Sequence, residues 1–150
     1  MGQVNIADST SNDFLITGIQ LEAGTSATDF EFLPIDVNLG RCQRYYYLHV
    51  IGNGQRVATG SAYSGSMIDG TIQFPVSMRA DPSLVIGSGT NYFRCYGNAT
   101  SDDVNTFTIL ETTVNLTGFR NDGQFSGTQG YSYFININNA SAFVAFSAEL

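Results

Sequence analysis

The chain has 150 residues, a formal net charge of −7 and no lysine, so arginine and one histidine are its only basic side chains. Binding to nucleic acid or to an anionic membrane surface needs a basic patch, and the sequence offers none. Charged residues make up 13% of the sequence, about half the usual quarter. Gly, Ser, Thr, Asn, Phe and Tyr are abundant instead, which is typical of rigid, turn-rich β-proteins.

We expect no secretory signal in the N-terminal residues, because no charged region is followed by an apolar one. No apolar run reaches the length of a membrane span. We therefore expect synthesis in a cytoplasm and no membrane insertion. A surface location would then require the protein to leave the cell as part of an assembly or by lysis.

The first elements in chain order form a short appendage. Residues 14–21 are apolar and β-prone and predict a strand, residues 22–26 predict a turn, and Pro34 interrupts the chain. Residues 35–40 predict a single helical turn, with Asp36 near its start and Gly40 at its end. We expect an N-terminal attachment segment, residues 1–34, followed by one β-domain, residues 35–150.

The remaining sequence alternates between β-prone runs and turn residues at short intervals. The Asp69–Gly70 pair suggests a bulge or an early turn inside one run. Residues 97–103 and 121–130 are polar and predict loops, and the last two strands predict a hairpin. The pattern indicates an all-β fold, an antiparallel, jelly-roll-like β-sandwich. The expected strands span residues 43–51, 55–62, 66–76, 84–86, 91–96, 104–110, 113–119, 131–137 and 142–148.

The sequence contains few residues suited to catalysis. We expect a protein that is not an enzyme and holds no cofactor or metal. His49 lies in a predicted strand with no adjacent nucleophile motif, so we expect its ring nitrogens to bond to neighbours. Asp102 and Asp103 are the only adjacent carboxylates, and a solvated loop or a weak calcium site are the alternatives. We expect Cys42 and Cys95 to be small, buried, free thiols.

Two segments resemble a junction in structural proteins of tailed bacteriophages and phage-derived particles. One has the form I-x-x-x-Q-L-E-x-G-x-x-A-T-x-F-E over residues 16–31, and the other has the form R-C-Q-R-Y-Y over residues 41–46. Residues 74–82, FPVSMRADP, and the ending Ala148-Glu149-Leu150 resemble further parts of the same C-terminal β-domains. Residues 83–142 match nothing in that pattern.

The resemblance implies a virion surface protein of the fibre or spike kind, found as a tail fibre or a head spike. A homotrimer is expected from it, with the N-terminal segment docked on another virion protein and the β-domain turned toward host-surface polysaccharide. The alternative is a purely structural capsid decoration, head-spike or baseplate connector protein with no receptor role. A depolymerase would need carboxylates at glycosidase spacing.

The junction normally follows a larger β-module, but here it follows a short polar tail. Either the chain is a fragment of a longer fibre, or residues 14–21 add to a partner's sheet, and we expect them to pair with another chain. Tyr45 and Tyr47 share one face of a predicted strand. They serve either packing in the core and between subunits or sugar stacking, and packing is favoured. The residues expected at the attachment interface are Phe14, Ile16, Ile19, Leu21, Phe30, Phe32, Tyr45 and Tyr47.

Sugar binding would use aromatic and amide side chains beside the two polar loops. Aromatic rings stack on sugar faces while short polar side chains bond to hydroxyl groups. The same composition also arises on surfaces that bind nothing. The candidate carbohydrate-binding residues are Tyr92, Tyr96, Asn98, Asn121, Asp122, Gln124 and Tyr131.

Overall fold

The computed structural model describes residues 16–26 and 28–149. The chain divides after Pro34 into two compact units. Phe14, one of the expected interface residues, lies outside the described ranges. No helix in the described part of the chain is long and apolar enough to cross a membrane.

The first unit is a loop held by its own side chains. The carboxylate of Glu22 accepts hydrogen bonds from the backbone amide of Thr28 (2.5 Å) and from its hydroxyl (2.6 Å). The amide oxygen of Gln20 accepts a bond from the backbone N–H of Glu31 (2.8 Å). Gln20, Glu22, Thr28 and Glu31 all belong to the junction pattern of the sequence, so these bonds give that pattern a structural meaning.

The strand predicted over residues 14–21 is not formed in its described part, residues 16–21. Gly18 lies in the middle of this run with a φ of +69°, which turns the chain away from the extended conformation. An isolated run of β-prone residues also has no neighbouring backbone to complete its hydrogen bonds.

The second unit begins with helix α1, Ile35–Gln43, which is longer than the predicted single turn. Pro34 precedes it, Asp36 lies in its first turn and Arg41 in its last, so both charges favour the helix dipole. Gly40 does not end the helix. Glycine costs about 1 kcal/mol relative to alanine inside a helix, and the favourable ends tolerate that cost here.

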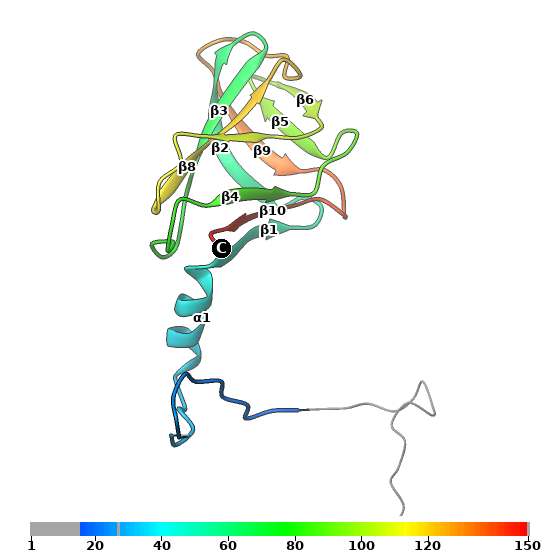
Figure 1. The fold of residues 1–150 in the computed structure, drawn as a ribbon. Helices are drawn as coiled ribbons and strands as arrows, with labels where there is room; N and C mark the ends of the chain where they lie inside the picture. Colours follow the sequence, from blue (N-terminus) through cyan, green and yellow to red (C-terminus); the bar gives the residue numbers. More distant parts are fainter. Residues whose placement is uncertain (1–15, 27, 150) are drawn as a thin grey trace, which may run out of the picture. The chain divides into compact units, whose positions relative to one another are not determined.

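The described residues of the second unit form two antiparallel sheets, which confirms the all-β sandwich class (Figure 1). The smaller sheet has the order β1-β10-β4, and the larger has the order β6-β5-β9-β2-β3-β8-β7. The strands are β1 Tyr46–Ile51, β2 Arg56–Ser64, β3 Met67–Gln73, β4 Ser83–Ile86, β5 Phe93–Gly97, β6 Thr100–Val104, β7 Thr108–Leu110, β8 Leu116–Asp122, β9 Ser132–Ile137 and β10 Phe143–Ser147.

Several local predictions were wrong. The strand expected over residues 104–110 is not continuous, because β6 ends at Val104 and β7 begins at Thr108. Residues 97–103 are not a loop, because Asn98 and Ala99 take positive φ angles (48° and 56°) and form the tight turn between β5 and β6. Asp69 and Gly70 do not interrupt β3, which pairs with β8 without a break. The last two strands are not a hairpin, since β9 lies in the larger sheet while β10 pairs with β1 and β4.

The core fills the space between the sheets with aromatic and branched side chains. Phe107 stacks on Phe119 of β8 at 4.2 Å and meets Phe93 of β5 edge-on at 5.3 Å. β5 and β8 lie near opposite ends of the strand order, so the larger sheet curls around this group of rings. Phe146 of β10 meets Phe74 edge-on at 4.9 Å and brings the smaller sheet into the same core.

Candidate carbohydrate-binding face

The outer face of the larger sheet carries a shallow hollow of about 400 Å³ where short side chains meet on three neighbouring strands. Successive residues of a strand point to opposite faces, so Thr59 and Ser61 of β2 face out while Ala58 and Ala62 face the core. Hydroxyls and one carboxylate line this surface. We call it the outer-face hollow; its lining residues are Thr59, Gly60, Ser61, Asp69, Gly70, Thr71 and Ser132.

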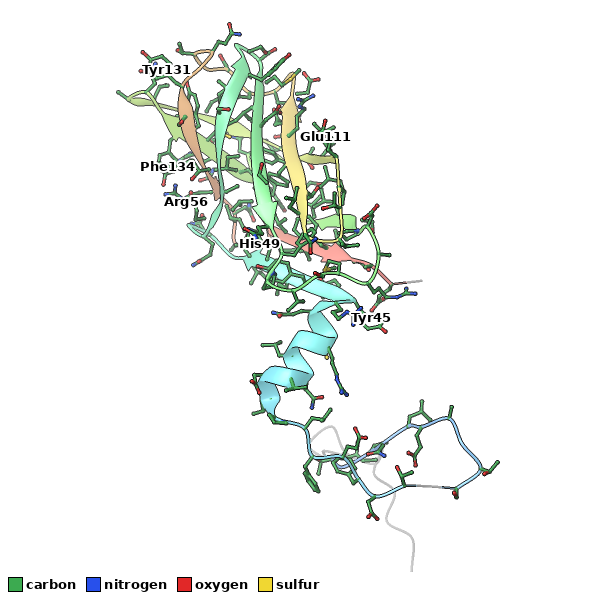
Figure 2. All side chains as sticks on the ribbon, turned by 90° about the vertical axis from the view of Figure 1, so that its left-hand side faces the viewer. Tyr45, His49, Arg56, Glu111, Tyr131 and Phe134 are labelled. Atoms are coloured by element: carbon green, nitrogen blue, oxygen red, sulfur yellow. The ribbon has the colours of Figure 1, made fainter. Side chains whose placement is uncertain are left out.

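A group of larger side chains stands beside the outer-face hollow on β5, β9 and the start of β2. Phe134 is directly opposite Thr59 on one side and Tyr96 on the other. The Phe134 and Tyr96 rings meet edge-on at 5.6 Å, and Phe134 remains 46% exposed. Figure 2 shows Tyr131, Phe134 and Arg56 following one another down the same side of the domain. We call Arg56, Tyr96, Phe134 and Asn136 the Arg56 cluster.

The other side of the hollow is closed by an ion pair. Arg120 of β8 donates two hydrogen bonds to the carboxylate of Asp69, each 2.5 Å long. The hydrogen bond to Asp69 raises the pKa of Arg120 above its ordinary value. The Arg120 guanidinium also lies 5.8 Å from the ring centre of the exposed Tyr63. The charge of the Asp69 carboxylate is therefore paired with that of Arg120, and the carboxylate is fixed in position at the edge of the hollow.

Three of the predicted sugar-binding residues lie on or near this face. Tyr96 is part of the Arg56 cluster. Tyr131 is half exposed just before β9, where its backbone carbonyl accepts a bond from the N–H of Ala62. Asn98 is exposed in the turn between β5 and β6, and its side-chain amide bonds to the hydroxyl of Thr128 (3.2 Å).

The remaining candidates lie elsewhere. Asn121 is only 4% exposed, and its amide bonds to the carbonyl of Thr106 (2.8 Å) and the N–H of Phe125 (2.9 Å), which fixes the loop after β8. Gln124 accepts a bond from the N–H of Asn105 (3.0 Å). With the exposed Asp122 they line a separate depression of about 160 Å³. Tyr92 is half-buried against the core.

The expected interface residues are mostly exposed. In the first unit Leu21 is 99% exposed and Phe32 is 89% exposed, and Ile16, Ile19 and Phe30 also face solvent. Tyr45 is exposed under the guanidinium of Arg79, at 5.5 Å from its ring centre. Tyr47 differs from the rest, because it is half-buried and packs against both Phe74 and Phe146.

The residues considered for chemistry have structural partners. His49 contacts the hydroxyl of Tyr47 through Nδ1 (3.1 Å) and the carbonyl of Val57 through Nε2 (2.7 Å), as expected. Asp103 forms a two-point ion pair with Arg94, and this bonding lowers the pKa of Asp103. Asp102 accepts a bond from the N–H of Ser126 (2.7 Å).

Both cysteines are free thiols, as expected, but only one of them is buried. Cys95 is buried in β5, and burial raises the pKa of its thiol to about 12. The prediction for Cys42 was wrong, because it lies on α1, of which no residue is buried. Within the described ranges there is no group of three or more His, Cys, Asp or Glu side chains that could hold a metal ion.

Most residues of the outer face were not predicted from the sequence, because the candidate residues were chosen beside the polar loops. The alternation of β2 and β9 places Thr59, Ser61 and Phe134 outward and could have marked them. That these side chains lie next to one another depends on the strand order β9-β2-β3, which the sequence alone does not give.

A scan against protein-family models, a search of curated proteins and a search of solved structures each found no match to this chain.

Proposed function

We propose that this protein is a virion structural protein of a tailed bacteriophage or phage-derived particle. It would be a trimeric fibre or spike whose β-domain presents a receptor-binding face to polysaccharide on the host surface. The virion assignment is supported by the junction pattern of residues 16–31 and 41–46. The observation that carries the binding role is the outer-face hollow, lined by hydroxyls and bordered by the exposed ring of Phe134.

The chemistry of this face suits sugars. The hydroxyl groups that line the hollow and the Asp69 carboxylate at its edge would exchange hydrogen bonds with sugar hydroxyls. The part of the Phe134 ring that Arg56 leaves exposed would pack against the apolar face of a pyranose. A shallow site of this kind gives weak binding to a single sugar unit. Three copies related by symmetry would bind a repeating polysaccharide together, and the combined affinity would exceed that of one site.

Attachment to the particle would use the first unit. Leu21 and Phe32 are almost fully exposed there, although the Glu22–Thr28 bonds hold the loop in one shape. Exposed apolar side chains on an ordered segment favour contact with another protein. In this proposal the first unit docks on a neighbouring virion protein.

The binding role is tested by measuring retention of the full chain on a panel of purified bacterial capsular and lipopolysaccharide glycans. We expect binding to at least one glycan and a loss of about tenfold or more in affinity for Phe134→Ala, which corresponds to roughly 1.4 kcal/mol. Leu116→Ala is the matched control, since Leu116 is 40% exposed on β8, beyond the hollow. Equal loss in both variants, or no retention on any glycan, would contradict the role.

A capsid decoration or connector protein without a receptor role is the second candidate. It is favoured by α1, on which Ile35, Val37 and Leu39 are all exposed and no residue is buried. Light scattering on the full chain addresses this alternative. A trimer in solution supports the fibre or spike, whereas a monomer that binds no glycan supports a connector that assembles only on its particle.

A further inference from the structure

Arg56 is held in a defined position on the outer face by aromatic and polar contacts. Its guanidinium carbon lies 3.9 Å from the ring centre of Phe134 and 5.5 Å from that of Tyr96. One of its terminal nitrogens donates a hydrogen bond to the Tyr96 hydroxyl (3.0 Å). The same hydroxyl accepts a bond from the side-chain amide of Asn136 (3.2 Å). A guanidinium fixed in this way loses little freedom when a ligand binds to it.

The charge of Arg56 is not compensated by any carboxylate of the described residues within ion-pair distance. The two other arginines of this sheet face differ from it, because Arg94 is paired with Asp103 and Arg120 with Asp69. The chain as a whole has a net charge of −7. The Arg56 guanidinium therefore keeps one positive charge and several N–H donors that an anion could use.

A second observation points to an incomplete set of contacts at the same place. The side-chain oxygen of Asn136 is shielded from solvent and accepts no hydrogen bond from the described residues. Buried polar atoms of folded proteins almost always have a partner, so this oxygen needs a hydrogen-bond donor from a ligand or an ordered water. A carboxylate has no donor to offer, but a hydroxyl group of the same sugar does.

We propose that the Arg56 cluster is a subsite for the carboxylate of an acidic sugar, such as a uronic acid unit of a polysaccharide. This inference rests on the proposed glycan-binding function and names the class of glycan. A planar carboxylate matches the donor geometry of a guanidinium and carries the single negative charge that Arg56 lacks. Phe134 connects the subsite to the outer-face hollow, since Thr59 is its direct neighbour across the strands. The next sugar unit of the polysaccharide, which is uncharged, would occupy the outer-face hollow.

The test compares uronic acid polymers with their neutral counterparts on the full-length protein. The probes are polygalacturonate, alginate and hyaluronate, each also in a carboxyl-reduced form in which the uronic acid has become a neutral hexose. We expect the protein to bind at least one of the native polymers, and carboxyl reduction of that polymer to weaken binding about tenfold or more. Dextran sulfate serves as a probe for binding by charge alone.

The variants isolate the role of Arg56. Arg56→Gln is expected to lose about tenfold in affinity for the native polymer while its affinity for the reduced polymer stays unchanged. Arg56→Lys keeps the charge but not the planar donors. Its affinity for the native polymer should fall between that of the unmodified protein and that of Arg56→Gln. Arg41→Gln is the control, because it removes the same charge from α1, outside the larger sheet, and its affinity should match the unmodified protein. Thermal melting of each variant verifies that it is folded.

Several outcomes would overturn the subsite. Equal affinity for native and reduced polymers, equal losses in the Arg56 and Arg41 variants, or equal binding to dextran sulfate would each do so. Binding to neutral glycans with no preference for uronic acids would remove the subsite but leave the proposed glycan-binding function intact. Absence of binding to every native, reduced and neutral polysaccharide would remove both.

Discussion

Glu22 shows at the scale of one residue why the junction pattern has its particular side chains. Its carboxylate accepts both the backbone N–H and the hydroxyl of Thr28, so residues 22 and 28 are tied across a turn that contains Gly24. The hydroxyl and backbone bonds lower the pKa of Glu22 below its ordinary value of 4.5. The bonded, ionised form is the one that holds the loop.

The Glu22 carboxylate predicts a pH-dependent loop. Because the pKa is lowered in the folded loop, the stabilisation is present above pH 4.5 and is lost as the pH falls through the lowered value. We expect the Thr28 amide signal in NMR spectra to move with a midpoint below 4.5. Glu22→Gln should abolish this titration, and Glu31→Gln should not. A midpoint at or above the ordinary value would show that the carboxylate is not bonded.

The contact between β2 and β3 depends on glycine at the scale of the element. A Cβ atom built on Gly60 would lie within a forbidden distance of the backbone oxygen of Asp69. Gly60 is directly opposite Gly70, so the two strands approach closely beneath the outer-face hollow. Backbone atoms cannot move aside as a flexible side chain can, and a larger residue would therefore separate the strands.

Gly60→Ala is expected to lower the free energy of unfolding by about 1–3 kcal/mol, the usual cost of overpacking. Urea denaturation followed by circular dichroism measures the change. Gly65→Ala is the control, since a Cβ there would make only an ordinary contact at 3.7 Å and its φ is not in the left-handed region. If both variants unfold at the same urea concentration as the unmodified protein, the close approach of the strands does not exclude a larger side chain at position 60.

The strands that were predicted correctly are those with turn-forming residues near their ends. β9 and β10 combine β-prone residues with Asn or Gly near their ends, and both were expected within one residue of their observed limits. β6 was missed because its polar sequence, TSDDV, is stabilised by pairing with β5 and not by its own composition. The turn before it uses Asn98 and Ala99 where glycine would normally signal a hairpin.

The candidate site was less predictable than the strands for the same reason. Tyr96 was expected to bind sugar, but its partners Arg56 and Phe134 are 40 and 38 positions away in the sequence and meet it only because β2 and β5 flank β9. Asn121 has the composition of a sugar-binding residue, yet burial commits its amide to the loop after β8. Residue type indicated the chemistry, while strand order decided which residues could act together.

At the scale of the whole molecule the chain consists of two units with different sources of stability. The buried core residues of the described part all lie between Val57 and Ala148, and the first unit contributes none of them. The second unit therefore has what it needs to fold by itself, whereas the first relies on local hydrogen bonds.

Deletion of residues 1–34 is expected to leave the cooperative thermal unfolding of the β-domain unchanged, because no core contact is removed. Calorimetry compares the deletion with the full chain. The matched deletion removes residues 143–148 and with them β10, and it should abolish the cooperative transition, since Val144 and Phe146 are fully buried. A melt that disappears on removal of residues 1–34 would mean that the first unit is part of the folding domain.

The position of β10 has a consequence for the order of events during synthesis. β10 is the central strand of the smaller sheet, between β1 and β4, yet it follows every other described strand in the sequence. Tyr46 at the start of β1 waits for its partner Ser147, about a hundred residues later. β10 must therefore leave the ribosome before the smaller sheet can form, so the domain completes its fold late in synthesis. Any protein that binds the complete domain at that stage binds a newly folded structure.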